Sequence, residues 1–274
     1  MSFLVLLLAL LLEKFSGVRA WIQRDGLILD LLRRAEATQP RPWLVLAGLV
    51  LAPCLVLWLI LTLLAPLAYG WLLLPLHLLV MLFALGRGDV LVALGPFRDA
   101  WRREDSQAAY HAAQRDLGIE AEESGELIQR VRGHLVWQAY QGFFAVIFWY
   151  ALLGPLPVLA YRLLALIQEH GSQQDLKDLA GQLRHAFDWL PARALAGTFA
   201  LVGQFEAVLN GLLERLLDWN ATAHALLADS ALAATNLQGA AEPADDSGLD
   251  RLWLLLVRSA IGWYLLFALW TILV

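Results

Sequence analysis

No Lys, Arg, Asp or Glu occurs between positions 43 and 86 of this chain. A helix needs about 20 apolar residues to cross the hydrocarbon core of a bilayer, so this window is long enough for two crossings. Pro66 and Gly70 mark a turn between them, because proline and glycine interrupt helical runs. We therefore expect a transmembrane hairpin over residues 43–86, made of helices 43–64 and 67–86.

The composition agrees with this prediction. Hydrophobic residues make up 59% of the 274 positions and charged residues only 16%, whereas a soluble domain carries about 25% charged residues. An apolar excess of this size excludes a disordered chain, and a single cysteine, Cys54, excludes a disulfide scaffold. The net charge of −5 lacks the basic footprint of a nucleic-acid-binding protein. The sequence predicts an integral membrane protein that contacts lipid and binds no nucleic acid.

Two later stretches also have the length of a membrane helix. Residues 135–161 contain no charged side chain and predict a crossing over 139–161, with the run Gly154-Pro155-Leu156-Pro157 near its end. A re-entrant segment is the alternative, which requires irregular backbone to be buried in protein. Residues 253–274 predict a C-terminal transmembrane helix. The sequence leaves open whether the apolar residues 2–12 span the membrane or pack against the other helices.

Basic residues predict the orientation. Residues 14–42 hold six Lys or Arg and residues 87–138 hold seven, and such residues favour the cytoplasmic side. Both flanks of the hairpin are therefore expected in the cytoplasm, with 87–138 forming a cytoplasmic helical segment. Residues 162–252 predict a further helical segment whose side of the membrane the sequence does not decide.

Helical patterns account for the polar segments as well. Residues 19–37 form an amphipathic pattern that fits a helix lying on the cytoplasmic membrane surface or, equally well, a helix packed on the bundle. Residues 98–117 predict a helix that ends at Gly118, and Ser172-x-x-Asp175 predicts the start of a helix that reaches about residue 185. No stretch alternates like a strand. The predicted fold class is all-α: a polytopic integral membrane helical protein with cytoplasmic amphipathic helices, built as one membrane domain over residues 1–274.

The chain carries no motif that names a reaction. It has neither a phosphate-binding GxxxxGK[ST] loop nor a GxGxxG turn, and its six histidines show no metal-type spacing. His77 is the one titratable side chain of the hairpin. Such a residue can be functional, but we expect a neutral histidine that donates to a backbone carbonyl of a neighbouring helix. No metal site and no catalytic residue are predicted.

A series of short motifs does point to a family. Phe148-Trp149, Gly154-Pro155, Tyr161-Arg162 and the run 188–193, Asp-Trp-Leu-Pro-Ala-Arg, follow one another along the chain. Their order and spacing resemble the CobD/CbiB family of bacterial inner-membrane proteins, and residues 103–106 are similar to its GRDT element. The resemblance covers most of the chain. For the cobalamin branch, it implies an ATP-dependent amide ligase that attaches aminopropanol phosphate to a corrinoid.

The acidic positions of the cobalamin branch are not kept here. That branch has EN-x-x-D before a PLFW element, then YR-x-x-NTLD and LDD-x-x-N-x-x-PAR. ATP-dependent activation of a carboxylate needs Mg²⁺, which is held by oxygen ligands such as Asp and Glu. The residues that stand at the corresponding positions of this chain are Trp137, Gln138, Gln141, Ala165, Gln168, Arg184, His185 and, in place of the last Asn, Asp188.

This pattern of kept and lost residues is similar to AmpE, a branch encoded beside a muropeptide amidase and associated with β-lactamase induction. The resemblance implies a non-catalytic signalling protein of the bacterial inner membrane, without a cofactor, in cell-wall muropeptide recycling. Its expected partners are membrane lipid, a muropeptide or phosphate-bearing ligand, and the amidase through a functional link. A homo-oligomer is a further expectation. The alternative is an ATP-dependent membrane amide ligase of the cobalamin-biosynthesis type, which would use ATP and Mg²⁺.

Polar residues kept at the membrane boundary are candidates for binding a ligand. Arginine can bind a phosphate or carboxylate through two parallel hydrogen bonds. The alternative is that Arg162 and Asp188 pair with each other and anchor helix ends, since buried charges are normally partnered. The candidate ligand-binding residues are Tyr161, Arg162, Asp188, Arg193, Arg103 and Asp105.

Overall fold

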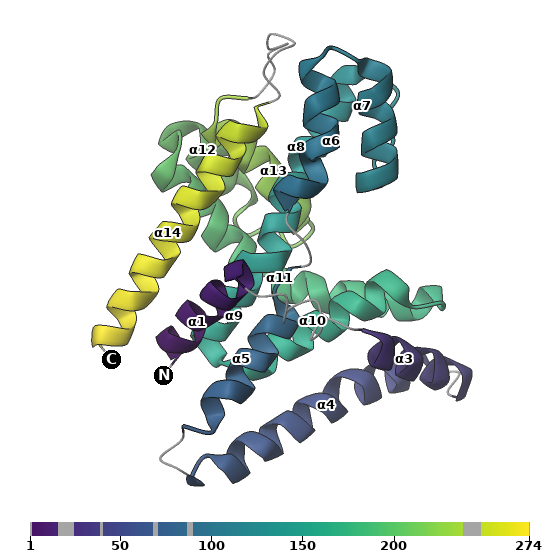
Figure 1. The fold of residues 1–274 in the computed structure, drawn as a ribbon, viewed down its shortest axis with the longest axis vertical. Coiled ribbons are helices and arrows are strands. Elements are labelled where there is room, and N and C mark those ends of the chain that lie inside the picture. Colours follow the sequence, from purple (N-terminus) through teal and green to yellow (C-terminus); the bar gives the residue numbers. More distant parts are fainter. Residues whose placement is uncertain are drawn as a thin grey trace. The chain divides into compact units, whose positions relative to one another are not determined.

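The structure is a computed structural model that describes residues 2–15, 25–38, 41–67, 71–86, 90–237 and 248–273. All regular elements within these residues are helical, which confirms the all-α prediction (Figure 1). The elements are α1 (Ser2–Phe15), α3 (Gly26–Thr38), α4 (Pro42–Leu64), α5 (Leu73–Ala84), α6 (Val90–Arg102), α7 (Ser106–Ala112), the π-helical turn η2 (Ala113–Leu117), α8 (Ser124–Ala139), the π-helical turn η3 (Tyr140–Phe144), α9 (Ala145–Leu153), α10 (Pro155–His170), α11 (Gln174–Val202), α12 (Phe205–Arg215), α13 (Ala223–Ala234) and α14 (Leu249–Leu273).

Three stretches in the described part of the chain are helical, long and apolar enough to cross a membrane. They are Pro42–Leu64, Ser124–Leu153 and Leu249–Thr271, and each overlaps a predicted crossing. The fourth predicted crossing, 67–86, is shorter than expected. Its helix α5 has 12 residues, or about 18 Å, because the chain turns at Trp71 and Leu72 and becomes extended again at Leu85 (ψ 147°).

The helix that overlaps the predicted crossing 139–161 begins and ends earlier than that range. The helix runs through α8, η3 and α9 and ends at Leu153, because Gly154 has φ +81°, a conformation that favours glycine. Pro155 then starts α10, at the first helical position where its missing N–H costs nothing. Tyr161, expected at the end of the crossing, therefore lies in the separate helix α10.

The turn η3 depends on two glycines. A π-helical turn inserts one residue into the helix, and here the carbonyl of Gly142 accepts a hydrogen bond from the Gly86 backbone N–H at 2.7 Å. A Cβ added to either glycine would come within 2.8 Å of the other glycine's Cα. The two backbones can approach this closely only without side chains.

Two predicted polar helices also differ from the structure. The single helix expected over 98–117 is broken by Glu104 (φ +56°), after which the Asp105 side chain accepts a hydrogen bond from Ala108 N–H and caps α7. Gly118 (φ +66°) ends the following turn as predicted. Helix α11 continues well past residue 185, through Pro191, to Val202.

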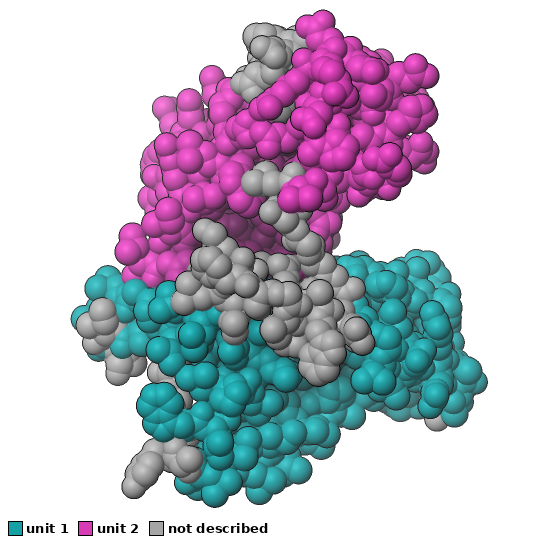
Figure 2. Space-filling view, viewed as in Figure 1, with its two compact units in different colours: residues 1–85, 145–188, 267–274 teal, residues 86–144, 189–266 magenta. Residues whose placement is uncertain are grey.

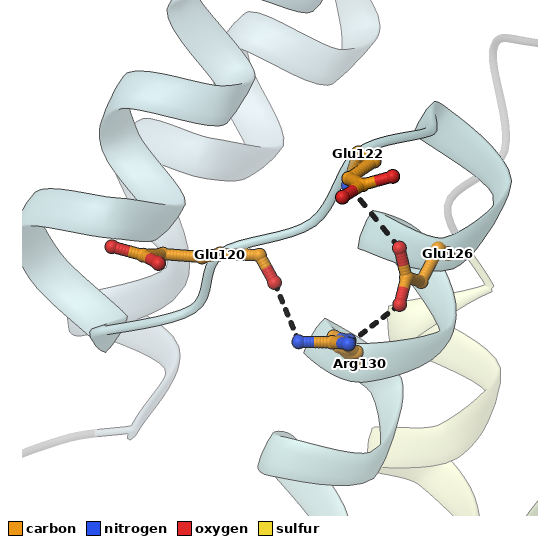
Figure 3. A network of polar contacts seen from close by, with 4 residues as sticks. All are labelled: Glu120, Glu122, Glu126 and Arg130. Carbon is orange, nitrogen blue, oxygen red and sulfur yellow. Dashed lines mark hydrogen bonds and ion pairs between the residues drawn. The ribbon is translucent and has the colours of Figure 1, made fainter.

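Arg130 and Glu126 of α8 bind the backbone of the segment that precedes this helix. Arg130 donates to the backbone carbonyl of Glu120 at 2.7 Å and to the Glu126 carboxylate, which also accepts the Glu122 backbone N–H at 3.2 Å (Figure 3). These side chains are largely exposed, so the network orders the start of α8 and adds little free energy of folding.

The described chain forms two compact units, coloured separately in Figure 2. Unit 1 comprises residues 1–85, 145–188 and 267–274, and unit 2 comprises residues 86–144 and 189–266. In unit 1, Leu32 of α3, Val45 and Leu46 of α4, Leu164 of α10 and Leu176 of α11 share one buried core. In unit 2, Trp263 packs edge-on against Phe144 and donates its indole N–H to the Thr198 hydroxyl at 2.8 Å.

Helix α3 corresponds to the amphipathic segment expected over 19–37, of which residues 19–24 lie outside the described residues. Burial of Leu32 in the unit 1 core shows that one face of α3 packs on the bundle. Glu36 of α3 accepts the backbone N–H groups of Ser172 and Gln173, at 2.8 and 3.3 Å, and the Ser172 hydroxyl at 2.7 Å. The two residues before α11 are thus bound by a carboxylate from α3, and the Ser172 hydroxyl, expected to cap the helix, donates to Glu36 instead.

His77 has a partner other than the one expected. Its Nδ1 lies 2.9 Å from the Tyr150 hydroxyl, and the two rings meet edge to face. The expected acceptor was a backbone carbonyl, and the observed partner is a side chain. The His77 ring has a hydrogen-bond partner in either arrangement.

Candidate functional site

Helices α10 and α11 bring Tyr161 and Asp188 together in unit 1. The Tyr161 hydroxyl donates to Asp188 Oδ1 at 2.9 Å, and both side chains are buried. Asp188 Oδ2 lies 3.7 Å from Nε of Arg184, which is one helical turn earlier on α11. Residues four apart lie on one face of a helix, so Arg184 and Asp188 both face α10.

Arg184 also contacts α10 directly. Its Nη1 donates to Gln168 Oε1 at 3.1 Å, and its guanidinium lies 5.6 Å from the centre of the Tyr161 ring. Tyr161 and Gln168 are seven residues apart and therefore share one face of α10. Gly181 leaves space for Gln168, because a Cβ there would lie 3.2 Å from the amide nitrogen.

Arg162 completes this set with a second acidic residue. Its Nη2 lies 3.7 Å from Asp25 Oδ2, and the two side chains are only 13% and 4% exposed. This separation exceeds the 2.7–2.9 Å typical of a charge-assisted hydrogen bond. Nε and Nη2 of Arg162 are buried and have no hydrogen-bond acceptor among the residues that the structure describes. We name the six residues Asp25, Tyr161, Arg162, Gln168, Arg184 and Asp188 the buried ion cluster.

The charges of the buried ion cluster are held in a poorly solvated environment. Burial raises the pKa of Tyr161 above its ordinary value, and the negative charge of Asp188 raises it further, so this hydroxyl remains a neutral donor. Burial lowers the pKa of Arg162; Glu169 acts in the opposite direction, and the like charge of Arg184 lowers it again. A bound anion would favour the charged form of Arg162 and so oppose both effects that lower its pKa.

Aromatic side chains from the family motifs lie beside the cluster. The Trp149 ring meets the Phe187 ring edge-on, 5.2 Å between centroids, and its indole N–H donates to the Phe187 carbonyl at 3.3 Å. Phe187 also lies 6.3 Å from the Tyr161 ring. The Phe148-Trp149 motif thus supports the residue next to Asp188.

Arg193 has a different environment, within unit 2. Its guanidinium donates to four backbone carbonyls, those of Trp189, Arg215, Leu216 and Asp218, at 2.6–3.2 Å, and it stacks on the Trp189 ring at 4.2 Å. Carbonyls at the end of a helix have no partner within the helix. Arg193 therefore joins the end of α12 to α11.

Arg103 and Asp105 also lie in unit 2, where both are exposed. The Asp105 carboxylate caps α7 through Ala108 N–H, at 3.0 Å. Of the six candidate residues, the structure brings Tyr161, Arg162 and Asp188 together in one unit. Within the described residues, no three His, Cys, Asp or Glu side chains converge as metal ligands would.

Three members of the buried ion cluster were not among the sequence candidates: Asp25, Gln168 and Arg184. Two of them had a signal in the sequence. Arg184 and Asp188 have the i, i+4 spacing of a helical ion pair, and Gln168 follows Tyr161 by two helical turns. Asp25 had none, because its pairing with Arg162 joins positions far apart in the chain.

Comparison with known proteins decides the family. Residues 1–246 match the profile of the family described as regulatory signalling modulator protein AmpE. The chain belongs to the AmpE family. This confirms the AmpE resemblance drawn from the motifs, while the wider relationship to CobD/CbiB stays an expectation. No curated protein and no solved structure gave a match.

Proposed function

We propose that this chain is a non-catalytic, multi-pass signalling protein of the bacterial inner membrane that binds a muropeptide or another phosphate- or carboxylate-bearing ligand. Ligand binding would couple cell-wall recycling, through a functional link to a muropeptide amidase, to β-lactamase induction. Membership of a signalling modulator family and three helices fit to cross a membrane support this proposal.

The observation that carries the proposal is the state of Arg162. A buried guanidinium normally has acceptors for most of its donors, and leaving one without them costs roughly 1–3 kcal/mol or more. In the described part of the chain, Arg162 has two buried nitrogens without an acceptor and one ion pair at 3.7 Å. The carboxylate or phosphate of a ligand would supply two parallel acceptors at this position.

Arg184 supports the non-catalytic part of the proposal. It stands where the cobalamin branch has an acidic residue, and here it carries a positive charge that faces Asp188 at 3.7 Å. A fixed guanidinium beside this carboxylate opposes the approach of Mg²⁺ by charge repulsion. The cluster is therefore better suited to an anion than to a metal–nucleotide complex.

The test measures binding and signalling with the same variants. We expect Arg162→Gln to lower the affinity of the purified protein for a muropeptide fragment bearing free carboxylates by about tenfold to hundredfold, since a charged hydrogen bond contributes about 1.5–3 kcal/mol. Arg162→Lys keeps the charge but loses the planar fork, so it should recover only part of the affinity. In cells, Arg162→Gln should impair β-lactamase induction as deletion of the gene does.

The matched control is Arg33→Gln, which removes an exposed arginine of unit 1 and should leave binding and induction unchanged. Protein abundance in the membrane fraction separates loss of ligand from loss of folding. Unchanged induction and muropeptide handling after deletion, under several inducers, would contradict the proposal. Hydrolysis of ATP by the purified protein only with Mg²⁺, an amine and a carboxylate would favour the ligase instead.

A further inference from the structure

The outer face of α3 presents apolar and basic side chains to its surroundings. Leu27, Leu31 and Arg34 follow one another at helical spacing and form one stripe. Leu27 is 79% exposed and Leu31 55% exposed, and Arg34 is exposed as well. The opposite face holds Leu32 in the unit 1 core, so the stripe serves no packing role within the unit.

The acidic residues of α3 and the acidic residue before it each contact a group outside the stripe. Glu36 binds the start of α11, Asp25 is buried beside Arg162, and Asp30 lies 3.6 Å from Arg33. Arg34 and Arg41 are exposed and give the stripe a positive potential. The stripe is therefore complementary in charge to an anionic surface.

The stripe is also continuous with a membrane helix. Helix α3 shares the unit 1 core with Val45 and Leu46, in the first turns of α4, and α4 is the most apolar of the three stretches fit to cross a membrane. Trp43, in the first turn of α4, is 56% exposed. Tryptophan is enriched at the membrane–water interface, which places this end of α4 at headgroup level.

We infer that the outer face of α3, together with Arg41 and Trp43, is a docking surface for an anionic lipid bilayer. Leu27 and Leu31 enter the boundary between headgroups and acyl chains, and Arg34 and Arg41 pair with lipid phosphates. This inference rests on the proposed membrane location of α4. It adds the class of lipid and the residues that bind it.

The test uses the full chain in lipid nanodiscs of phosphatidylcholine, with or without phosphatidylglycerol. In a Cys54→Ala background, a nitroxide is attached at Leu31→Cys, and its accessibility to oxygen and to a water-soluble nickel complex is measured by electron paramagnetic resonance. Two labels serve as references: Leu55→Cys on the exposed side of α4, and Gln107→Cys on the exposed polar surface of α7. We expect the Leu31 label to favour oxygen, as the Leu55 label does, and more strongly with phosphatidylglycerol.

A charge variant tests the lipid class. The preference for phosphatidylglycerol is the gain in oxygen over nickel accessibility of the Leu31 label when this lipid is added. The neutral variant Arg34→Gln with Arg41→Gln should reduce this preference by about fivefold for each arginine. The matched control Arg102→Gln removes an exposed arginine of unit 2 and should leave that preference unchanged. Equal preference in the neutral variant and the unaltered chain would overturn the role of the two arginines.

The outcomes separate this inference from the proposed function. A Leu31 label as accessible to nickel as the Gln107 label, with the Leu55 label in lipid, overturns the docking surface alone. A Leu31 label protected from both reagents indicates a protein occupant and also overturns it. A Leu55 label in water would instead overturn the membrane location of α4. A second label at Leu27→Cys, measured in the same way, shows whether the Leu31 result holds for the whole stripe.

Discussion

Arg162 and Arg193 both lie in motifs from which the family resemblance was drawn, and both side chains are at least largely buried, yet their surroundings differ. Arg193, in unit 2, donates to four backbone carbonyls at 2.6–3.2 Å. Arg162, in unit 1, lies 3.7 Å from Asp25, and among the described residues two of its buried nitrogens have no acceptor. A guanidinium has five N–H donors, so Arg193 is nearly saturated by its own chain while Arg162 retains capacity for another group.

The hydrogen-bond partners distinguish a structural arginine from a ligand-binding one more clearly than burial does. Both side chains are withdrawn from water, and both stand in a motif. The hydrogen-bond partners distinguish them, because a saturated arginine cannot bind a ligand without giving up bonds that hold the fold. We therefore assign Arg193 to the stability of unit 2 and propose Arg162 as the ligand-binding arginine.

The largest expected effect is that of Arg193→Gln. Loss of the guanidinium leaves three carbonyls at the end of α12 and in the following turn without their donor, which should lower the free energy of unfolding by about 3 kcal/mol. Urea unfolding in mixed micelles, followed by tryptophan fluorescence, measures this. Arg103→Gln, at an exposed arginine of the same unit, is the control and should change stability by less than about 0.5 kcal/mol. Equal effects of the two variants would contradict the structural role.

Tyr161→Phe should have an intermediate effect. It removes the hydroxyl that donates to Asp188 at 2.9 Å and leaves a buried carboxylate with one donor fewer, which costs about 1–2 kcal/mol. The same unfolding measurement tests it. Because the hydroxyl is neutral at physiological pH, this cost should not change between pH 6 and about pH 8; a strong dependence in that range would show that the hydroxyl ionises.

The double variant Asp25→Asn with Arg162→Gln should have a small effect on stability. Replacing a loose buried ion pair by neutral side chains removes both charges together with their desolvation penalty, and Asn keeps the shape of Asp25 for its other contacts, so the free energy of unfolding should change by less than about 1 kcal/mol. Binding of the muropeptide fragment should nevertheless be lost in calorimetry. If the double variant unfolds as easily as Arg193→Gln, the two arginines do not differ in role.

The smallest effect is expected from Arg215→Gln. Arg215 pairs with Asp229 at 2.6 Å, but both side chains are about half exposed, at 47% and 56%, and such surface pairs contribute about 0.2–1 kcal/mol. Unfolding in low and high salt measures the difference, which should shrink as salt screens the pair. A salt-independent loss above this range would mean that the side chain of Arg215, in addition to its carbonyl, supports the Arg193 contacts.

Helix bounds could be predicted from the sequence where the change from charged to apolar residues coincides with the end of the helix. The start of α4 follows Arg41, and Pro42 occupies its first position, one residue before the start predicted from the charge-free window. The predicted crossing 139–161 extends past the end of its helix at Leu153, because hydrophobicity continues through Gly154 to Tyr161. The positive φ of Gly154 ends the helix, and hydrophobic patterning alone does not report a single backbone angle.

The candidate site was predicted in part. Tyr161 and Asp188 lie in recognisable motifs and meet in the structure, whereas the pairing of Arg162 with Asp25 joins positions whose distance in sequence gives no hint of contact. Arg193 was grouped with the ligand-binding residues because its motif resembles those of the family. Its role depends on carbonyls at 215, 216 and 218, which any residue type would supply, so no side-chain pattern could reveal them.

The sequence by itself determined that the chain is helical, that much of it is too apolar for an aqueous core, and that it belongs with the AmpE family. These properties follow from composition and local order, since lipid demands long uncharged helices whatever their neighbours are. Only the tertiary structure decided which buried arginine is saturated and which is not. That distinction depends on the distances between groups from separate helices. These distances cannot be inferred from the order of residue types along the chain.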